Sequence, residues 1–369
     1  MRKPTCVLFI LALAMTSHAA DWPQYRADAA RTGYTPDEVP QKLACVWEYE
    51  PPSAPDPAWQ GADTRMPFDR AYHVVVANGL LYFGSSGDCT VYALDAATGR
   101  ERWSYCTDAP VRLAPAVWKD RVFATSDDGH LYCLDAASGE LLWKQRGGPR
   151  GDMVLGNDRM VGRWPARGGV AVDGDIVYYA AGIWPSEGIY LYALDAATGD
   201  LVWLNDTSGG IEMDQPHGTA RAKSGVSIQG YLVVSEDRVF APTGRAVPAA
   251  FSKSDGTFDY FQLQVNRAYG GSPTAVIGPY LFNNRQLFEA ATGDNLGGVA
   301  SPCVVATPDY LIYASGAELR ALPRANMVVE KDAVDRKGQP IRVKELTAPA
   351  WAFEAPCELE NEVKMWDSN

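Results

Sequence analysis

The side chains best suited to bind a ligand lie in three short segments of this 369-residue sequence. They comprise two guanidiniums, two indoles, two carboxylates and one imidazole. Aromatic plates beside polar donors suit a sugar or another planar polar ligand. Packing within the loops, partner or ligand binding, and catalysis all remain open roles at this stage. The candidate ligand-binding residues are Arg163, Trp164, Arg167, Trp184, Glu187, Asp214 and His217.

If these residues serve only to hold the loops rigid, Arg167 and Glu187 are expected to form an internal ion pair. Charged and aromatic loop residues often pack against one another in this way. No Cys-x-x-Cys pair or histidine-rich cluster indicates a metal site, so none is predicted.

The elements that position these segments are predicted to be β-strands in a repeated unit. The stretch from Val91 to Gly99 returns almost unchanged as Leu131 to Gly139 and as Leu191 to Gly199. Each copy is followed by a tryptophan, and degraded copies end at Gly256 and Gly293. A repeat of roughly 40 residues is typical of propeller blades.

Each unit is read as four antiparallel strands. In the first unit they are expected at 73–77, 80–85, 90–95 and 100–106, because Asn78-Gly79 and Asp95 to Gly99 are turn sequences. The tryptophans are expected to pack between blades and the aspartates to accept hydrogen bonds from turn amides. The repeat residues predicted to be structural are Asp95, Gly99, Trp103, Asp135, Gly139, Trp143, Asp195, Gly199 and Trp203.

The motif Ala93-x-Asp95-x-x-Thr98-Gly99-x-x-x-Trp103 resembles the tryptophan-docking repeat of pyrroloquinoline-quinone (PQQ)-type β-propellers. The resemblance covers about residues 43–354 and implies an all-β propeller of four-stranded blades. That superfamily includes quinoprotein alcohol dehydrogenases and the propeller lipoprotein of the outer-membrane assembly machinery. The resemblance therefore implies the fold and leaves the function open.

About six units are recognisable, in a ring that is expected to be incomplete or irregularly closed. Cys45 to Tyr49 resembles an outer strand with no blade before it, and Trp351 to Glu354 reads as the outer strand of the sixth unit after a polar insert. The domain prediction is a signal peptide at 1–20, an extension at 21–42, the propeller at 43–354 and a tail at 355–369. Truncation of a longer reading frame is one explanation for the incomplete ring.

The long insertions are predicted to share one rim. Loops between strands two and three and loops between blades lie at the same end of a propeller. Segments 147–167, 182–188 and 207–224 are of these two kinds, so the candidate ligand-binding residues are expected to meet.

Charge and leader sequence favour an exported protein. Residues 1–20 carry Arg2 and Lys3 before an apolar run, which is typical of a signal peptide, and a periplasmic or extracellular location is predicted. Removing them changes the formal net charge from −12 to −14, because two positive charges and no acids are lost. Such acidity argues against nucleic acid or anionic lipid as partners. No later stretch could span a bilayer.

Six cysteines remain after residue 20 and permit 15 pairings. If the third and fourth strands of the first unit turn at Ala97-Thr98, Cys89 and Cys106 lie opposite each other. A Cys89–Cys106 disulfide is therefore a hypothesis, which a register slip of one residue would remove.

Two functions are weighed. The first is a non-catalytic exported propeller that acts as a binding or assembly module for a protein or a glycan. The second is a quinoprotein dehydrogenase, which would place PQQ across the propeller axis with calcium beside it. The chain has no Cys-Cys dipeptide and fewer blades than the dehydrogenases it resembles, so the binding module is preferred and no cofactor is expected.

Overall fold

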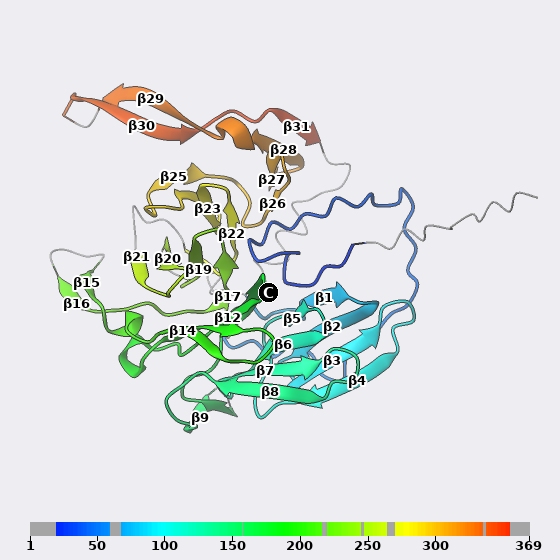
Figure 1. The fold of residues 1–369 in the computed structure, drawn as a ribbon. Coiled ribbons are helices and arrows are strands. Elements are labelled where there is room, and N and C mark those ends of the chain that lie inside the picture. The colour runs from blue at the N-terminus through cyan, green and yellow to red at the C-terminus, as the bar shows by residue number, and fades with distance from the viewer. Residues whose placement is uncertain are drawn as a thin grey trace, which may run out of the picture.

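The computed structural model describes residues 20–59, 68–156, 158–215, 220–244, 247–263, 270–334 and 337–354. Over these residues the chain forms six antiparallel four-stranded sheets, which follow one another around an arc (Figure 1). One sheet gains a short fifth strand that pairs in parallel. The predicted all-β propeller of four-stranded blades is confirmed.

The blades take their strands in chain order. Blade 1 contains β1 (Val74–Ala77), β2 (Leu80–Ser85), β3 (Thr90–Asp95) and β4 (Glu101–Cys106), and blade 2 contains β5 (Ala116–Trp118), β6 (Arg121–Thr125), β7 (His130–Asp135) and β8 (Leu141–Arg146). Blade 3 contains β11 (Gly168–Asp173), β12 (Ile176–Ala181), β13 (Tyr190–Asp195) and β14 (Leu201–Asn205), with β17 (Gly230–Tyr231) beside β11. Blade 4 contains β18 (Val233–Val234), β19 (Arg238–Ala241), β20 (Val247–Ser252) and β21 (Phe258–Gln262). Blade 5 contains β22 (Thr274–Ile277), β23 (Tyr280–Asn283), β24 (Gln286–Glu289) and β25 (Asn295–Gly298). Blade 6 contains β26 (Val304–Ala306), β27 (Tyr310–Ser315), β28 (Glu318–Pro323) and β31 (Trp351–Glu354).

Insertions add three hairpins and three short 3₁₀ turns. The hairpins are β9 (Met153–Gly156) with β10 (Arg159–Gly162), β15 (Glu212–Asp214) with β16 (Arg221–Lys223), and β29 (Val328–Val334) with β30 (Pro340–Leu346). The 3₁₀ turns are η1 (Pro185–Glu187), η2 (Ser208–Gly210) and η3 (Arg324–Asn326).

The repeated aspartate shapes the turn between the third and fourth strands. The Oδ1 atom of Asp135 accepts the backbone N–H of Ser138 at 2.8 Å and its hydroxyl at 2.8 Å. Gly139 follows with a φ of +75°, a left-handed conformation that glycine adopts without Cβ strain. Asp95 and Asp195 make the same contacts with Thr98 and Thr198.

These turns receive the tryptophans of the preceding blade. The indole of Trp103 covers Gly139 and donates to the carbonyl of Ala136 at 2.9 Å, and only 7% of the residue is exposed. Four of these contacts join an outer-strand ring to the turn of the next blade, and the fifth joins Trp47, which lies outside any strand, to the turn of blade 1. The full series of ring and turn glycine is Trp47 with Gly99, Trp103 with Gly139, Trp143 with Gly199, Trp203 with Gly256, and Tyr260 with Gly293.

The segment from Trp22 to Thr32, predicted only as an extension, lies along the inner strands of the blades. Its backbone or side chains bond, in chain order, with one inner-strand residue of every blade. The partners are Val76, Val117, Val172, Val234, Val276 and Ala306. Arg31 is fully buried and donates to four backbone carbonyls, those of Leu232, Val170, Tyr25 and Asp28. The segment thus holds the six blades together near the axis.

The ring stays open between blades 6 and 1. Buried apolar clusters join each blade to the next from blade 1 to blade 6. The outer face of blade 1 is instead covered by Tyr49 and Tyr72, which pack on Phe83. The dark-blue N-terminal segment lies between blades 6 and 1 (Figure 1).

The Cys89–Cys106 disulfide hypothesis is wrong, because both thiols are free. A β-bulge between Ala93 and Leu94 shifts the pairing by one residue, so Cys106 lies opposite Thr90. Cys89 falls outside the strand with a φ of +61°.

Candidate functional site

Two of the predicted rim loops meet directly. Arg163, after the β9–β10 hairpin, donates to the Glu187 carboxylate at 2.8 Å from Nε, and the indole N–H of Trp164 donates to the Glu187 carbonyl at 2.7 Å. Trp164 is only 5% exposed. The third loop joins them through η2, which contacts η1. Arg163, Trp164 and Glu187 therefore hold the rim together.

The predicted Arg167–Glu187 ion pair is wrong. Glu187 pairs with Arg163, while Arg167 precedes the inner strand β11 and turns toward the axis, where it binds Asp127. Asp214 lies away from this contact, in the exposed β15–β16 hairpin, and pairs with Arg221 at 3.3 Å. His217 lies outside the described residues.

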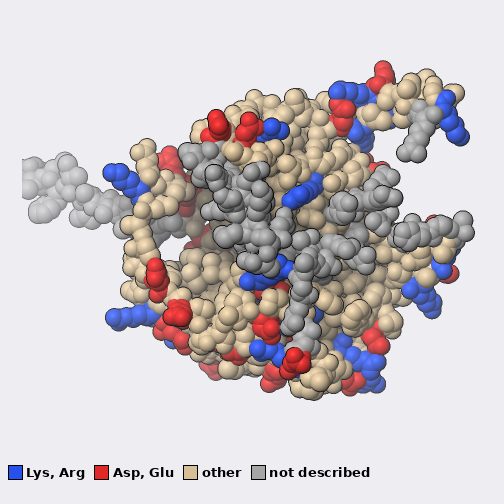
Figure 2. Space-filling model, turned by 180° about the vertical axis from the view of Figure 1, so that it is seen from behind, with Lys and Arg blue, Asp and Glu red and all other residues tan. Residues whose placement is uncertain are grey.

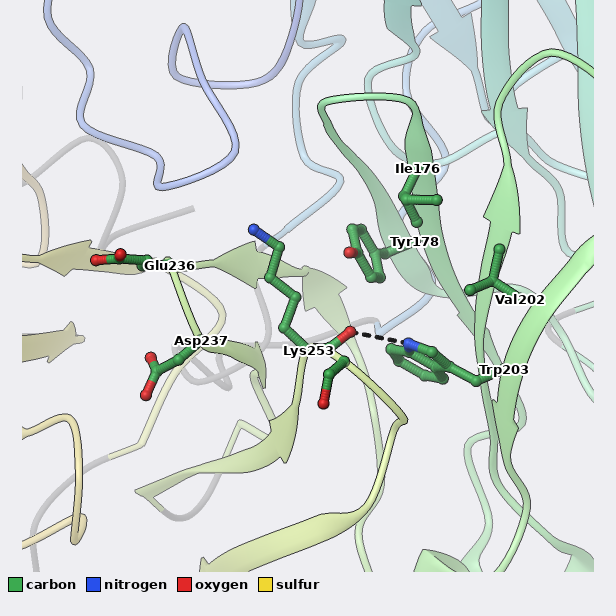
Figure 3. A pocket seen from close by; sticks show the side chains of 8 residues that line it. Ile176, Tyr178, Val202, Trp203, Glu236, Asp237 and Lys253 are labelled. Carbon is green, nitrogen blue, oxygen red and sulfur yellow. Dashed lines mark hydrogen bonds between the residues drawn. The ribbon is translucent and has the colours of Figure 1, made fainter.

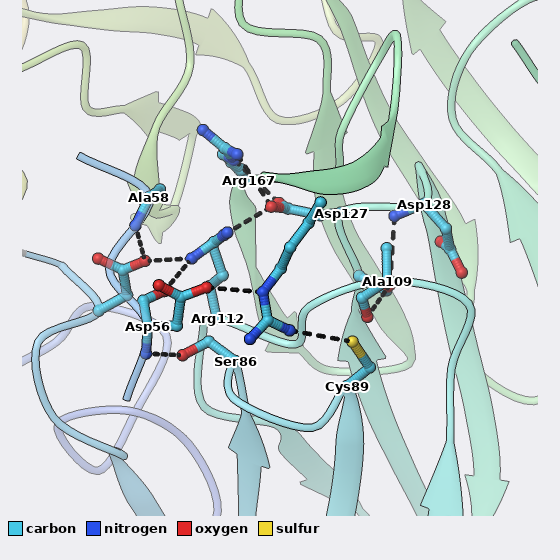
Figure 4. A network of polar contacts seen from close by, with 12 residues as sticks. Asp56, Ala58, Ser86, Cys89, Ala109, Arg112, Asp127, Asp128 and Arg167 are labelled. Carbon is cyan, nitrogen blue, oxygen red and sulfur yellow. Dashed lines mark hydrogen bonds and ion pairs between the residues drawn. The ribbon is translucent and has the colours of Figure 1, made fainter. Parts of the chain in front are cut away.

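Arg167 belongs to a buried polar cluster that the sequence did not indicate (Figure 4). Both oxygens of Asp127 accept hydrogen bonds from Arg167 at 2.9 Å. Arg112 donates to Asp127 at 2.5 Å and to Asp69 at 2.9 Å. All four side chains are 6% exposed or less. The cluster contains two positive and two negative side chains, so its net charge is zero.

The pKa values reflect this arrangement. Burial alone would raise the pKa of Asp127, but the guanidiniums of Arg167 and Arg112 outweigh it and hold the pKa below its usual 3.8. Burial raises the pKa of Asp69 above 3.8, against the pull of Arg112. The two carboxylates differ because Asp127 receives two guanidiniums.

The axis is filled by layers of side chains. Next to the N-terminal segment, Tyr25 stacks on Tyr231 with ring centroids 3.6 Å apart, and the Tyr231 hydroxyl bonds His73 at 2.8 Å. Burial lowers the pKa of His73 to about 4. The arginine–aspartate cluster lies beyond this layer, because Arg112 and Arg167 precede the inner strands β5 and β11. Trp59 lies next to Arg167, and its indole donates to Gln229 at 2.8 Å.

A quinone site does not fit these axial residues. The guanidiniums that could bind the carboxylates of PQQ are already bound to Asp127 and Asp69. In the described part of the chain, no three His, Cys, Asp or Glu side chains are grouped so that they could hold a metal ion.

The rim carries exposed apolar side chains around this axial end. Trp184 is 52% exposed, and its ring meets that of Trp59 edge-on with centroids 6.4 Å apart. One face of the β9–β10 hairpin shows Met153, Leu155 and Met160, which are 38%, 75% and 53% exposed. We call these five residues the rim surface.

The backbone from Asp56 to Trp59 links the β9–β10 hairpin to the exposed tryptophans. Arg159 in β10 pairs with Asp56 at 2.8 Å, and Trp59 lies three residues after Asp56. The rim surface is therefore held in place by the Arg159–Asp56 ion pair at the tip of the hairpin and by the Arg163–Glu187 pair beside η1.

A concavity separate from the rim surface lies between blades 3 and 4 (Figure 3). It encloses about 450 Å³, with Trp203 and Tyr178 on one side and the 236–237 turn on the other. Trp203 donates to the Lys253 carbonyl at 2.9 Å, as Trp47 and Trp103 donate to the carbonyls of Ala96 and Ala136. None of the predicted rim residues lines this hollow.

Acidic and basic side chains alternate over the face seen in Figure 2. The β29–β30 hairpin, which projects at the upper right of that view, carries both signs. Its charged face pairs Arg342 with Glu330 at 3.3 Å and with Asp332 at 3.5 Å. No helix within the described ranges is long and apolar enough to cross a membrane.

A family model described as outer membrane protein assembly factor BamB, PQQ_2, matches residues 46–163 and 157–278. These two matches cover more than half of the chain and include the docking repeats. The chain belongs to this BamB-like PQQ-propeller family. A search of curated proteins finds no match.

Solved structures similar to this BamB-like propeller include both functional classes. The model aligns with a europium-containing methanol dehydrogenase at a TM-score of 0.51 and 13% identity, covering 92% of this chain and 74% of that one. It aligns with BamB from Moraxella catarrhalis at a TM-score of 0.46 and 16% identity, covering 73% and 74%. A quinohemoprotein alcohol dehydrogenase from Comamonas testosteroni gives 0.46 and 16%, covering 88% and 52%. The first of these supports the fold alone.

Proposed function

We propose that this BamB-like propeller is a non-catalytic exported module that binds a protein partner through its rim. The observation that carries the proposal is the rim surface, where Met153, Leu155, Met160 and Trp184 are exposed together. Isolated exposed apolar residues are common, but a grouped set on positioned loops marks an interaction site. Methionine and leucine adapt to the apolar side chains of a protein surface.

The choice of a protein over a glycan rests on the same residues. Three thioether or aliphatic side chains offer no hydrogen bonds to sugar hydroxyls, whereas they can fill the apolar centre of a protein interface. The polar candidates Arg163 and Glu187 bond to each other, and Arg167 is buried. In this proposal Trp184 is the predicted ligand residue that contacts the partner.

The filled axis supports the binding module over the quinoprotein dehydrogenase. A dehydrogenase would need PQQ and calcium at the axis, where Arg112 and Arg167 are already neutralised. The family's description suggests the class of partner, an outer-membrane protein during its assembly. The leader-like residues 1–20 are consistent with export into the compartment where such assembly takes place.

The proposal is tested with a fluorescently labelled, urea-unfolded outer-membrane β-barrel protein diluted into the full-length chain. We expect saturable binding by anisotropy, and a Leu155→Ser/Met160→Ser double variant should weaken it at least about tenfold, because central apolar contacts are worth roughly 1–2 kcal/mol each. The matched control is Val334→Ser/Ile341→Ser, which removes equally exposed apolar groups from the distant β29–β30 hairpin.

Three results would contradict the proposal. The first is equal weakening by both double variants, and the second is no binding at all. The third is stoichiometric uptake of PQQ with calcium followed by alcohol-dependent dye reduction, which would establish the dehydrogenase instead.

A further inference from the structure

Blade 6 presents an outer-strand tryptophan that docks on no turn within the described part of the chain. Trp351 lies opposite Ala321, as Trp103 lies opposite Ala93 and Trp203 opposite Ala193. It therefore occupies the docking register of the repeat. Among the described residues, no turn glycine lies against its ring.

The exposure of Trp351 follows from the missing turn. It is 37% exposed, against 7% for Trp103 and 8% for Trp203. Its ring meets Tyr310 edge-on at 6.0 Å between centroids, which is a contact within its own blade. The indole has the position of a docking residue and lacks the surface on which the others dock.

The whole face around Trp351 is apolar. The strand pairing places Val305, Ile312, Ala321 and Trp351 in one cross-strand row, with Phe353 two residues further on the same face. Phe353 is 56% exposed. The opposite face of blade 6 packs on blade 5 through a separate buried cluster. Within the described ranges, blade 6 thus packs against another blade on one face only.

Residues 43–50, on the other side of the opening, dock on blade 1 without forming a strand. Trp47 covers Gly99 and donates to the Ala96 carbonyl at 3.1 Å, so it docks on blade 1 as an outer-strand residue would. Its own segment, residues 43–50, forms no strand, and Leu43 and Val46 are 78% and 81% exposed. Residues 43–50 thus occupy the position of an outer strand, but no described strand pairs with them.

Trp351 and residues 43–50 indicate the same kind of binding partner for the opening. Trp351 lacks a turn with a left-handed glycine and an accepting carbonyl, and the segment around Trp47 lacks an adjacent strand. Three antiparallel strands ending in an Asp-x-x-(Ser/Thr)-Gly turn supply both, since the turns covered by Trp47, Trp103 and Trp143 are built in this way. Glu48, Glu50 and Glu354 at the borders favour basic residues beside those strands.

We propose that this opening, the blade-6 face together with residues 43–50, docks a three-stranded propeller-type β-sheet of a partner polypeptide. The sheet enters between blade 6 and Trp47, covers Trp351 with its turn and pairs its third strand with residues 45–49. This surface is distinct from the rim surface and does not depend on the function proposed for the rim.

The test uses the full-length protein and a synthetic peptide of residues 114–139, which contains three strands and the turn that takes Trp103. We expect saturable one-to-one binding by calorimetry. Trp351→Ala should weaken the binding at least about tenfold, the typical loss for truncating a central aromatic contact. The matched control is Leu201→Ala, which truncates a 58% exposed apolar side chain on the outer strand of blade 3 and should leave the affinity unchanged. A peptide with its Gly139 position changed to valine should bind more weakly, because the bulkier turn obstructs the indole.

Other outcomes would overturn the proposal. These are no binding of the peptide, or equal loss with Leu201→Ala. Sedimentation showing a dimer that Trp351→Ala converts to a monomer would assign the face to a second copy. Tighter peptide binding after deletion of residues 355–369 would assign it to the chain's own C-terminal residues. Unchanged far-UV circular dichroism and thermal midpoint confirm that Trp351→Ala remains folded.

Discussion

At the scale of single residues, burial and pairing decide which polar groups can act. Arg167 and Trp164 look like ligand residues because loop guanidiniums and indoles often are. The structure buries both, and their polar atoms bond Asp127 and Glu187. Trp184, in the same rim, keeps half its surface exposed because its ring meets only the edge of Trp59.

His73 gives a prediction at this scale. Its pKa is lowered to about 4 in the folded chain, against about 6.5 unfolded, so the unfolded state binds more protons between these values. Stability is therefore fully present above pH 6.5 and falls by about 1–3 kcal/mol as the pH drops to 4. Urea unfolding measured from pH 8 to pH 4 checks this.

The matching variant is His73→Gln, which should reduce that slope while costing about 1 kcal/mol at pH 8 through the altered bond to Tyr231. If His73→Gln leaves the slope between pH 6.5 and pH 4 unchanged, the histidine is not its source.

At the scale of elements, one local turn and one ring account for most of the architecture. The aspartate side chain closes the turn, glycine permits its left-handed residue, and the preceding blade's aromatic ring covers that glycine. The fifth contact uses Tyr260 in place of tryptophan, and its hydroxyl donates to the Ala290 carbonyl at 2.9 Å. The geometry of the contact is therefore kept where the sequence motif has decayed.

The turn glycines give the second prediction. Gly139→Ala should destabilise the fold by about 2–4 kcal/mol, because a Cβ there would lie 2.6 Å from the Trp103 ring at a φ of +75°. Gly79→Ala has the same φ with nothing within 4 Å, and should cost about 1 kcal/mol. Thermal unfolding of the pair separates steric contact from backbone strain. Equal losses would mean that the docked ring contributes nothing.

At the scale of the whole molecule, the ring of blades is open, and the N-terminal segment from Trp22 to Thr32 connects the blades instead of direct contact between the first and the last. Residues 22–32 bond the inner strand of each blade, so ends of the arc that do not touch are still connected. The opening leaves one blade face and one unpaired segment exposed, which is the basis of the proposed docking of a three-stranded sheet.

Arg31 gives the prediction at this scale. Its buried guanidinium donates to carbonyls of blades 3 and 4 and of its own segment, and burial lowers its pKa to about 10. Arg31→Met should lower the free energy of unfolding by about 2–4 kcal/mol, because it leaves buried carbonyls without donors.

The control for this prediction is Arg150→Met, which removes an exposed pair with Asp152 and should change stability by less than about 0.5 kcal/mol. Hydrogen exchange should show faster exchange at inner-strand amides in several blades of Arg31→Met. A loss confined to one blade would contradict the bridging role of the segment.

The sequence by itself determined the blade. The strands of blade 1 and the outer strand of blade 6 were predicted within about one residue, because hairpins depend on turn residues that are neighbours in the chain. The place of the docking tryptophans followed from their fixed spacing to the turn, and the open ring from the lone outer-strand segment at Trp47.

Only the tertiary structure decided which polar groups pair and which surfaces remain free. Asp127 meets Arg167 from 40 residues away, and Arg31 meets Val170 from 139 residues away. No local pattern encodes such contacts, because they depend on how whole blades stack. The one-residue bulge that separates Cys89 from Cys106 could likewise not be predicted from the sequence, since the register of a strand depends on both pairing partners.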